Sequence, residues 1–479
     1  MTAHALRPIG PGTRREFLRT LGGGAALLAA HVFRAADLAG GDPWDEVPDI
    51  LRRIKPPVFP HRSFDVTRHG AIGDGTTDCT EAIRRAIAAC HAGGGGRVVI
   101  PSGEFLTGAI QLKSNVELHV SSGAVLRFSR DPRHYLPAVF TRWEGMECMN
   151  YSPFIYAWEQ ENIAVTGEGT LDGNADAEHW WPWKGNAGHG WTAGLPTQQN
   201  DRNILMQLTE KEVPVKDRVF GDGHYLRPQF LQPYRCKNIL IEGITIKNSP
   251  MWEIHPVLSR NVTVRNVKIV SHGPNNDGCD PESCADVLIK DCHFDTGDDC
   301  IAVKAGRNQD GRRVGVPCEN VVIQSCTMKD GHGGVAIGSE MSGDIRRVFA
   351  EDCQMDSPHL ERALRLKTNA LRGGELEHIY MRNVRVGQVA ESAVEIDFFY
   401  EEGEAGPYRP VVRNVGVRNL SSRKSKYALY LRGFATAPIC DISLEHCTFD
   451  NVARPNVIEN VRGLRLSDVK INGKMIAST

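Results

Sequence analysis

The sequence predicts an all-β fold, a solenoid in which the chain winds into a parallel β-helix. The main observation is a seven-residue pattern with apolar residues at positions two, four and seven, which recurs nine times between residues 238 and 469 at steps of 22 to 36 residues. Each copy reads as a strand with one buried face, and one short strand per unit at such spacing is typical of stacked repeats. A propeller is excluded because each blade needs four strands.

The N-terminal residues predict an export signal over residues 1–36. Arg14 and Arg15 precede a short apolar run from Leu21 to Ala30, as in twin-arginine signals. The run is shorter than the roughly 20 apolar residues that span a bilayer. A basic N-terminal helix is the alternative. We expect a periplasmic or secreted protein with no membrane association after the signal is removed.

Residues 37–62 are rich in proline and predict a linker, and residues 63–479 predict a single catalytic domain. Residues 63–75 read as a strand that ends in a Gly-rich turn. Asp78 and Glu81 then form a capping-box pattern, followed by apolar residues at helical spacing up to Cys90. We expect this N-terminal helix to cap the open end of the solenoid, which would otherwise expose unpaired strand edges.

The repeat is interrupted by an insertion over residues 173–233. It contains Trp180, Trp181, Trp183, Trp191 and Tyr225. A connection of this length is usually functional or disordered. These rings either form a wall of a substrate cleft or anchor the insertion to the coils, and the sequence leaves both readings open.

Charge and cysteine usage exclude several classes of protein. The net charge of −2 gives no overall field that favours nucleic acid or an anionic membrane. Four of the thirteen cysteines, at positions 292, 326, 353 and 447, share position seven of the repeat and read as small apolar residues of an inward stack. There is no Cys-x-x-Cys spacing, so we predict no zinc site. We also predict no other metal and no cofactor, and we expect a monomer.

The repeat register brings candidate catalytic residues together. Asp298 and His332 each lie twelve residues after the start of consecutive repeats, which places them on one face of adjacent coils. Asp299 follows directly, and Asp277 lies in a Gly- and Pro-containing turn one coil earlier. The pair of Asp298 and Asp299, taken alone, would more often be a solvated turn. Their shared register is what favours a site.

Three cations join this set as candidate substrate-binding residues. Arg365 and Lys367 alternate with leucines, and Lys304 ends the strand that follows the acid pair. Taken alone, each reads as the solvent-facing side of a strand.

Several motifs resemble those of family 28 of the glycoside hydrolases, the polygalacturonase family of pectin-degrading β-helix proteins. The opening of the domain, Phe64-Asp-Val with Gly70 to Asp78, is similar to that of these proteins. The resemblance rests further on Asn275-Asn-Asp-Gly-Cys-Asp280, Gly297-Asp-Asp299, Gly331-His-Gly333 and Arg365-Leu-Lys367. Asn276 and Leu366 depart mildly from the family pattern, at positions that supply no acid or base.

The resemblance implies a right-handed parallel β-helix that hydrolyses α-glycosidic bonds of galacturonate polymers with inversion. It implies that Asp298 is the general acid and that Asp277 and Asp299 activate water. It also implies that His332 supports protonation of the acid, and that Arg365 and Lys367 bind the substrate carboxylate.

Elementary chemistry makes such an arrangement sensible. Glycoside hydrolysis needs one protonated carboxyl and a second carboxylate, and crowding of carboxylates raises one pKa, so we expect Asp298 to be protonated. Cations suit a pectic substrate with uronate groups. We expect exo action, because the insertion can close one end of the cleft. The alternatives are a Ca²⁺-dependent pectate lyase and a non-catalytic β-helix that serves binding or adhesion.

Overall fold

The computed structural model describes residues 41–476, in two compact units that divide between Glu46 and Val47. The described residues of the first unit form the short 3₁₀ helix η2 (Pro43–Glu46). The predicted export signal, residues 1–36, lies outside the described residues and stays a prediction. In the described part of the chain, no helix is both long and apolar enough to cross a membrane.

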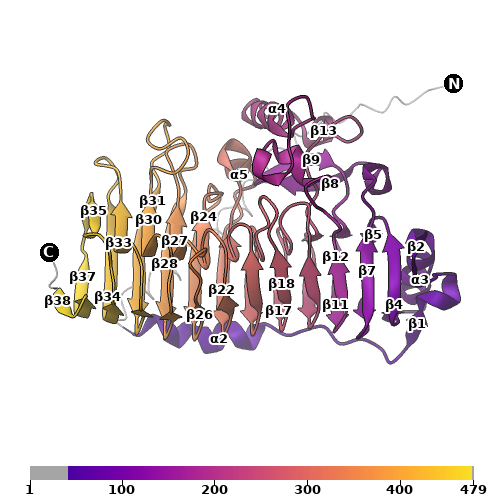
Figure 1. Cartoon of the computed structure of the whole chain (residues 1–479), viewed down its shortest axis with the longest axis horizontal. Helices are drawn as coiled ribbons and strands as arrows, with labels where there is room; N and C mark the ends of the chain where they lie inside the picture. The colour runs from indigo at the N-terminus through magenta and orange to yellow at the C-terminus, as the bar shows by residue number, and fades with distance from the viewer. Residues whose placement is uncertain (1–40, 477–479) are drawn as a thin grey trace, which may run out of the picture. The chain divides into compact units, whose positions relative to one another are not determined.

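The second unit is a parallel β-helix, as predicted, with three ladders of parallel strands (Figure 1). In the first ladder, each strand pairs with the strand of the next coil. Its apolar side chains, such as Val287 and Ile289, point into a continuous core. The strands of this ladder are β1 (Ser63–Asp65), β3 (Gly96–Ile100), β6 (Val116–Val120), β11 (Glu161–Gly167), β15 (Lys237–Glu242), β17 (Arg260–Arg265), β19 (Ala285–Lys290), β22 (Cys318–Gln324), β25 (Ile345–Glu351), β28 (Glu375–Arg382), β31 (Val411–Arg418), β34 (Ile439–Phe449) and β37 (Arg465–Ile471).

The second ladder follows after a sharp bend. Position six of the repeat lies at this bend with positive φ, as in Asn266 and Asp291, and Asn and Asp tolerate this conformation better than most residues. The strands are β2 (Asp74–Asp78), β4 (Gly103–Thr107), β7 (Ala124–Phe128), β12 (Thr170–Asp172), β16 (Thr245–Lys247), β18 (Lys268–Ser271), β20 (His293–Thr296), β23 (Thr327–Met328), β26 (Gln354–Met355), β29 (Arg385–Val386) and β32 (Ser421–Ser422). At the C-terminal end, β34 also pairs with β32 and β36 (Val461–Arg462), and β38 (Lys474–Ile476) turns back on β37.

The third ladder carries the candidate site. Its strands are β5 (Ile110–Gln111), β10 (Ile155–Trp158), β14 (Leu231–Tyr234), β21 (Ile301–Val303), β24 (Val335–Gly338), β27 (Arg362–Lys367), β30 (Ser392–Asp397), β33 (Tyr427–Arg432) and β35 (Val457–Glu459). Single bridges at Ile254, Val257, Cys279 and Glu282 continue the ladder from β14 to β21. The register is therefore unbroken across the coils that hold the acids.

Two helices precede or begin the solenoid. The sequence predicts a linker over residues 37–62, but α2 (Val47–Arg53) forms within it and packs beside β19 and β22. Arg53 explains this docking, because it forms an ion pair with Asp286 at 2.7 Å. The predicted helix after residue 78 forms as α3 (Thr80–Ala92) and packs against β1 and β3. Its role as a cap stays a prediction.

Excursions from the coils build a lobe beside the third ladder (Figure 1). One excursion is the antiparallel hairpin of β8 (Val139–Trp143) and β9 (Met146–Asn150), which the repeat analysis did not predict. The insertion, predicted over residues 173–233, contains η5 (Trp181–Lys184), η6 (Ala187–His189), α4 (Gln199–Glu210), η7 (Val215–Asp217) and β13 (Val219–Phe220) before the coils resume at β14. The strand β13 pairs with β9, so the two excursions form one structure. A third excursion holds α5 (Asn308–Val314).

The cysteines behave as predicted for an inward stack. Cys292, Cys326 and Cys353 occupy equivalent places on consecutive coils, directly before strand pairs in register. All thirteen cysteines are free thiols, and all except Cys440 are fully buried. They therefore fill the core as small apolar side chains.

Candidate active site

The register of the third ladder brings the predicted residues to one edge. Cys279, Ile301, Val335 and Leu364 are successive partners across four coils. The acids and the histidine precede these partners by two or three residues. They therefore gather where the chain enters the ladder.

Asp298 and His332 are in direct contact, as their equal offsets in the repeat predict. His332 Nδ1 lies 2.9 Å from Asp298 Oδ1, and the backbone N–H of His332 donates to the carbonyl of Asp298 at 3.0 Å. Asp298 Oδ1 also accepts the N–H of Asp299 at 2.9 Å. The imidazole is half-exposed while the carboxyl is mostly buried, so the pair lies at the boundary between protein and solvent.

Asp299 is fully buried and paired with both predicted cations of β27. Lys367 Nζ lies 2.6 Å from Asp299 Oδ2, and Arg365 Nη1 donates to Oδ1 at 3.2 Å. Both cations also lie over the ring of Tyr400. The strand alternation that makes Arg365 and Lys367 read as solvent-facing instead places them on one side of the strand, toward Asp299.

Asp277 lies deeper, beside Lys304. Lys304 Nζ is 3.6 Å from Asp277 Oδ2, 3.7 Å from Asp280 Oδ2 and 3.3 Å from Glu340 Oε2. It also lies 4.4 Å from the ring centroid of Trp252. Asp277 Oδ1 has no hydrogen-bond partner within the described protein. This buried oxygen is therefore available to a ligand or water.

The pKa values of Asp277, Asp298 and His332 shift in different directions. Burial raises the pKa of Asp277 well above its usual range, and the charges of Asp280 and Asp298 add to this. Burial acts to raise the pKa of Asp298 too, but the hydrogen bond and charge of His332 outweigh it and lower that pKa. The hydrogen bond to Asp298 raises the pKa of His332 to about 9.

These shifts correct one expectation. The sequence predicts that crowding keeps Asp298 protonated. In the structure the raised pKa belongs to Asp277, because burial and the charges of Asp280 and Asp298 outweigh the charge of Lys304. Asp299 has a lowered pKa as well: burial acts to raise it, but Lys367 and Arg365 outweigh burial. The proton near Asp298 is held by His332.

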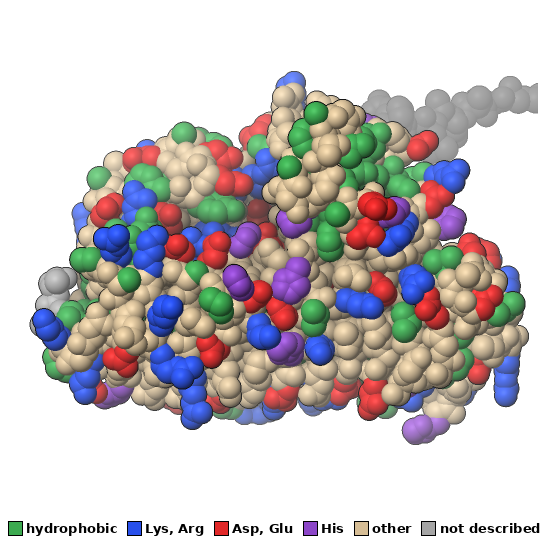
Figure 2. Space-filling model, in the orientation of Figure 1, with side chains coloured by type: hydrophobic (Ala, Val, Ile, Leu, Met, Phe, Trp, Pro, Cys, Tyr) green, Lys and Arg blue, Asp and Glu red, His purple; other side chains and the backbone are tan. Residues whose placement is uncertain are grey.

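A cavity of about 510 Å³ opens over these residues. Asp277, Asp298, His332, Lys304 and both cations of β27 line it. Six residues of the insertion also line it: Lys184, Asn186, His189, Gln198, Gln199 and Arg202. Figure 2 shows acidic and histidine side chains gathered on this face, below the lobe that carries α4. The insertion therefore forms one wall of the site, and the side chains that line this wall are polar rather than aromatic.

The tryptophans of the insertion act as anchors. Trp180 is buried against Tyr135 and Phe154, and Trp181 Nε1 donates to the carbonyl of Ser249 at 2.8 Å. None of the four insertion tryptophans lines the cavity among the described residues. The aromatic wall is made by Trp252 and Tyr400, which no repeat or motif indicates.

Ion pairs close one side of the cavity. Arg202 of α4 pairs with Glu144 at 2.7 Å and with Glu401 at 3.7 Å. Glu401 also pairs with Arg307 at 3.1 Å and Arg372 at 2.6 Å. These contacts tie the insertion to the loop after β30 and the loop before α5. The partners lie outside the repeat pattern and far apart in sequence, as with Arg307 and Glu401 at a separation of 94 positions, so sequence reasoning did not find them.

The three acids could offer ligands to a metal ion, because one oxygen of each lies within 4.8 Å of the others. Cations of the protein already lie beside two of these acids. Arg365 and Lys367 hold Asp299, and Lys304 lies beside Asp277. A Ca²⁺ ion prefers six to eight oxygen ligands. The arrangement suits a uronate carboxylate near the cations better than it suits a cation among the acids.

Comparisons with known proteins agree with this geometry. The model of the glycosyl hydrolases family 28 matches residues 221–463, just over half of the chain, and this range includes every candidate residue. A probable polygalacturonase from Vitis vinifera is 29% identical over 413 residues, which cover 82% of this chain and 75% of that protein. An exo-poly-alpha-D-galacturonosidase from Dickeya chrysanthemi is 28% identical over 358 residues, which cover 71% of this chain and 57% of that longer protein.

A solved structure extends the likeness to nearly the whole chain. The crystal structure of a hyperthermoactive exopolygalacturonase from Thermotoga maritima is similar with a TM-score of 0.89 and 47% identity, and the match covers 91% of this chain and 97% of that one. The fold, the motifs and the family match agree with one another. The chain is a glycoside hydrolase and belongs to family 28 of the glycosyl hydrolases.

Proposed function

We propose that this enzyme hydrolyses α-glycosidic bonds of pectic chains made of galacturonate. One observation carries the proposal: Asp277, Asp298 and His332 line a single cavity together with three buried cations, Lys304, Arg365 and Lys367. The acids supply the groups that glycoside hydrolysis needs. The cations supply partners for a carboxylate on the sugar, and the relatives named above are polygalacturonases.

The pair of Asp298 and His332 acts as the proton donor. The two side chains share one proton across 2.9 Å, and interacting groups of this kind titrate as a pair. The raised pKa of His332, about 9, means that the pair keeps this proton at neutral pH. As the glycosidic bond breaks, this one proton passes from His332 Nδ1 through Asp298 to the leaving oxygen, which leaves His332 neutral and Asp298 ionised. Asp277 and Asp299 activate the attacking water.

The raised pKa of Asp277 favours a second assignment, in which Asp277 is the donor and Asp298 the base. Activated aryl galacturonides separate the two assignments, because a good leaving group needs no proton. The variant of the true donor, either Asp298→Asn or Asp277→Asn, keeps activity on the activated substrate and loses it on the polymer. The variant of the base loses activity on both.

We propose exo action on the basis of the ion pairs on one side of the cavity. Arg202, Glu144 and Glu401 join the insertion to the coil loops there, and such a junction favours binding of a polymer end over binding of a continuous chain. Two of the relatives named above are exo-acting by name. Early digests of polygalacturonate should therefore contain one short product. A ladder of mixed oligomers would show endo action.

The stereochemistry of the products is open to a direct test. We propose inversion on the strength of the family resemblance. The nearest oxygens of the three acids lie within 4.8 Å, while inverting pairs are typically about 6.5–9.5 Å apart. Time-resolved proton NMR of the first anomeric product decides: the β anomer supports inversion, and the α anomer shows retention.

The central experiment compares wild type with Asp298→Asn on polygalacturonate in the presence of a chelator. Saturated products that vanish in the variant support hydrolysis. Unsaturated products with ultraviolet absorbance, or activity lost to the chelator alone, would indicate a lyase, and no cleavage would direct the search to other pectic linkages. We also propose that the enzyme works as a monomer after export, for which the basis is the sequence alone.

A further inference from the structure

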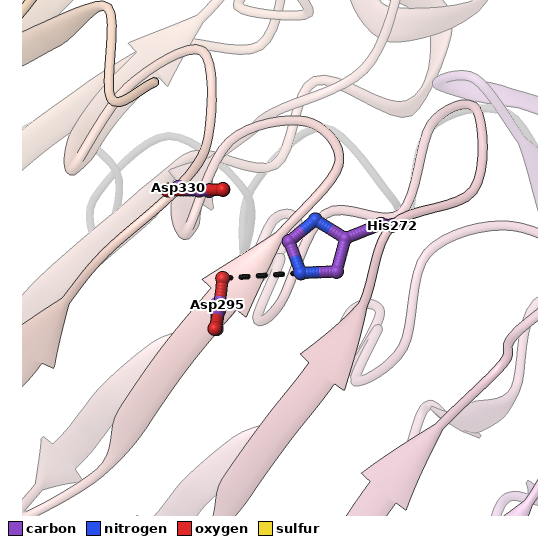
Figure 3. A group of neighbouring side chains, drawn as sticks. All are labelled: His272, Asp295 and Asp330. Carbon is purple, nitrogen blue, oxygen red and sulfur yellow. Dashed lines mark ion pairs between the residues drawn. The ribbon is translucent and has the colours of Figure 1, made fainter. Parts of the chain in front are cut away.

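A second group of polar side chains lies beside the active site, on three consecutive coils. His272 follows β18, Asp295 lies in β20, and Asp330 follows β23. One ligand atom of each lies within 4.8 Å of the other two. His272 Nε2 is 3.1 Å from Asp295 Oδ1, and Figure 3 shows the imidazole and both carboxyls around one common space. Neither the motifs nor the proposed reaction uses these residues.

The charges of this cluster are incompletely balanced. Lys329 Nζ lies 3.9 Å from Asp295 Oδ2, at the edge of ion-pair range, and is itself more than half exposed. Among residues 41–476, no basic side chain forms an ion pair with Asp330. Its Oδ1 accepts a hydrogen bond from the hydroxyl of Ser357. The hydroxyl orients the carboxylate and leaves its charge uncompensated.

Two members of the cluster, His272 and Asp330, line a cavity of about 350 Å³. His359 and Glu361 line it too and add another imidazole and another carboxylate. Gly297 and His332 line both this cavity and the larger active-site cavity. A bound ion would therefore have room for further ligands and would lie next to the catalytic pair.

We propose that His272, Asp295 and Asp330 bind a divalent first-row transition-metal cation such as Mn²⁺ or Zn²⁺. An imidazole favours metals of the zinc type and carboxylates favour Mn²⁺, so a mixed set selects this class over Ca²⁺, which prefers oxygen ligands throughout. Metal–ligand bonds of about 2.0–2.2 Å require the three ligand atoms to draw together. The exposed side chain of His272 can make this adjustment, and water can complete the coordination.

Mn²⁺ titration of the full chain, followed by electron paramagnetic resonance after chelator treatment, tests the site without any assay of activity. We expect one Mn²⁺ bound per chain, displaced by Zn²⁺. His272→Gln and Asp330→Asn should each raise the Kd at least tenfold. Because His272 is exposed, its variant should fold normally. His446→Gln is the matched control, since this exposed imidazole contacts Asp468 outside the cluster and its loss should leave Mn²⁺ binding unchanged.

Lys329→Gln provides a test in the opposite direction. Removal of the nearby cation should tighten Mn²⁺ binding. Asp298→Asn locates the ion, because the three catalytic acids form the other candidate cluster. If Asp298→Asn abolishes binding while Asp330→Asn does not, the ion lies in the active site and the proposal is overturned. Equal Mn²⁺ affinity in wild type and Asp330→Asn, or no saturable binding in wild type, would also overturn it.

Discussion

Arg227 Nη2 donates a hydrogen bond to Oδ1 of Asn275 at 2.8 Å, which links the insertion to the catalytic turn. The same guanidinium donates to the carbonyls of Pro250 at 2.7 Å and Pro274 at 2.6 Å, and to Gln198 at 2.9 Å. Asn275 Nδ2 in turn lies 3.4 Å from Asp298 Oδ2. A fully buried arginine thus positions the turn that carries Asp277 and contacts Asp298.

Arg227→Lys should lower kcat with little change in KM. A lysine keeps the charge but cannot reach four acceptors, because it lacks the planar fork of donors. Displacement of a catalytic group by about 1 Å can cost roughly a hundredfold in rate. Steady-state kinetics on galacturonate oligomers measure the effect, with circular dichroism to confirm folding. Unchanged kcat in a folded variant would show that Arg227 only joins the insertion to the coils.

The activity should fall on the alkaline side near pH 9. His332 has a folded pKa of about 9, against about 6.5 for an unperturbed histidine. The proton of the pair is therefore present below pH 9 and is lost above it. The stabilisation from this pair follows the same sign: it is complete below about pH 6.5 and disappears as the pH rises through 9.

NMR titration of the His332 ring measures its pKa, and the pH profile of kcat/KM measures the alkaline loss of activity. His332→Gln should remove the alkaline limb and lower kcat, because glutamine cannot return a proton to Asp298. As a control, His446→Gln removes an exposed imidazole that pairs only with Asp468 among the described residues, and its profile should match wild type. An alkaline limb that survives in His332→Gln would assign that limb to another group.

Lys367→Met should destabilise the protein and abolish activity. It leaves the buried carboxylate of Asp299 with Arg365 alone, and removal of one partner from a buried ion pair costs about 3–5 kcal/mol. Chemical denaturation at neutral pH measures the loss. The difference from wild type should shrink as the pH falls, because the lowered pKa of Asp299 gives stability that is present above about pH 4 and lost below it.

Lys367→Arg is the matched control for this position. It preserves the charge beside Asp299 and should recover most of the stability, while the altered geometry keeps kcat low. If Lys367→Met proves as stable as wild type, then Asp299 takes up a proton and the pair contributes little to folding.

Glu401→Ala should loosen the closed side of the cavity. The carboxylate pairs with Arg202 of the insertion and with Arg307 and Arg372 of the coils, so its loss frees the junction between them. Product profiles of polygalacturonate digests should gain longer oligomers. Glu404→Ala, in the same loop but exposed, should keep the wild-type profile. Identical profiles for both variants would place the origin of exo action elsewhere.

The sequence was sufficient for the parts of the site that follow the repeat. Equal offsets placed Asp298 against His332, and strand alternation placed Arg365 and Lys367 on one side of β27. It was insufficient for Arg227, whose contacts depend on how the insertion folds back over the coils. The protonation states of the acids could not be predicted from the sequence either, because the depth of burial of Asp277 and the charges around it are properties of the assembled site.

The first position of the repeat offers a test of the fold itself. Asn320 has φ of 58°, donates to Asp286 Oδ1 at 3.1 Å and accepts from Arg347 Nε at 2.7 Å. Asparagine suits this position because it tolerates the left-handed region and extends the side-chain ladder along the coils. Asn320→Ala should lose both benefits and cost about 1–3 kcal/mol. Asn320→Gly keeps the backbone conformation and should cost less. Denaturation midpoints of the two variants measure the difference, and equal losses would mean that the ladder, not the backbone, sets the preference for asparagine.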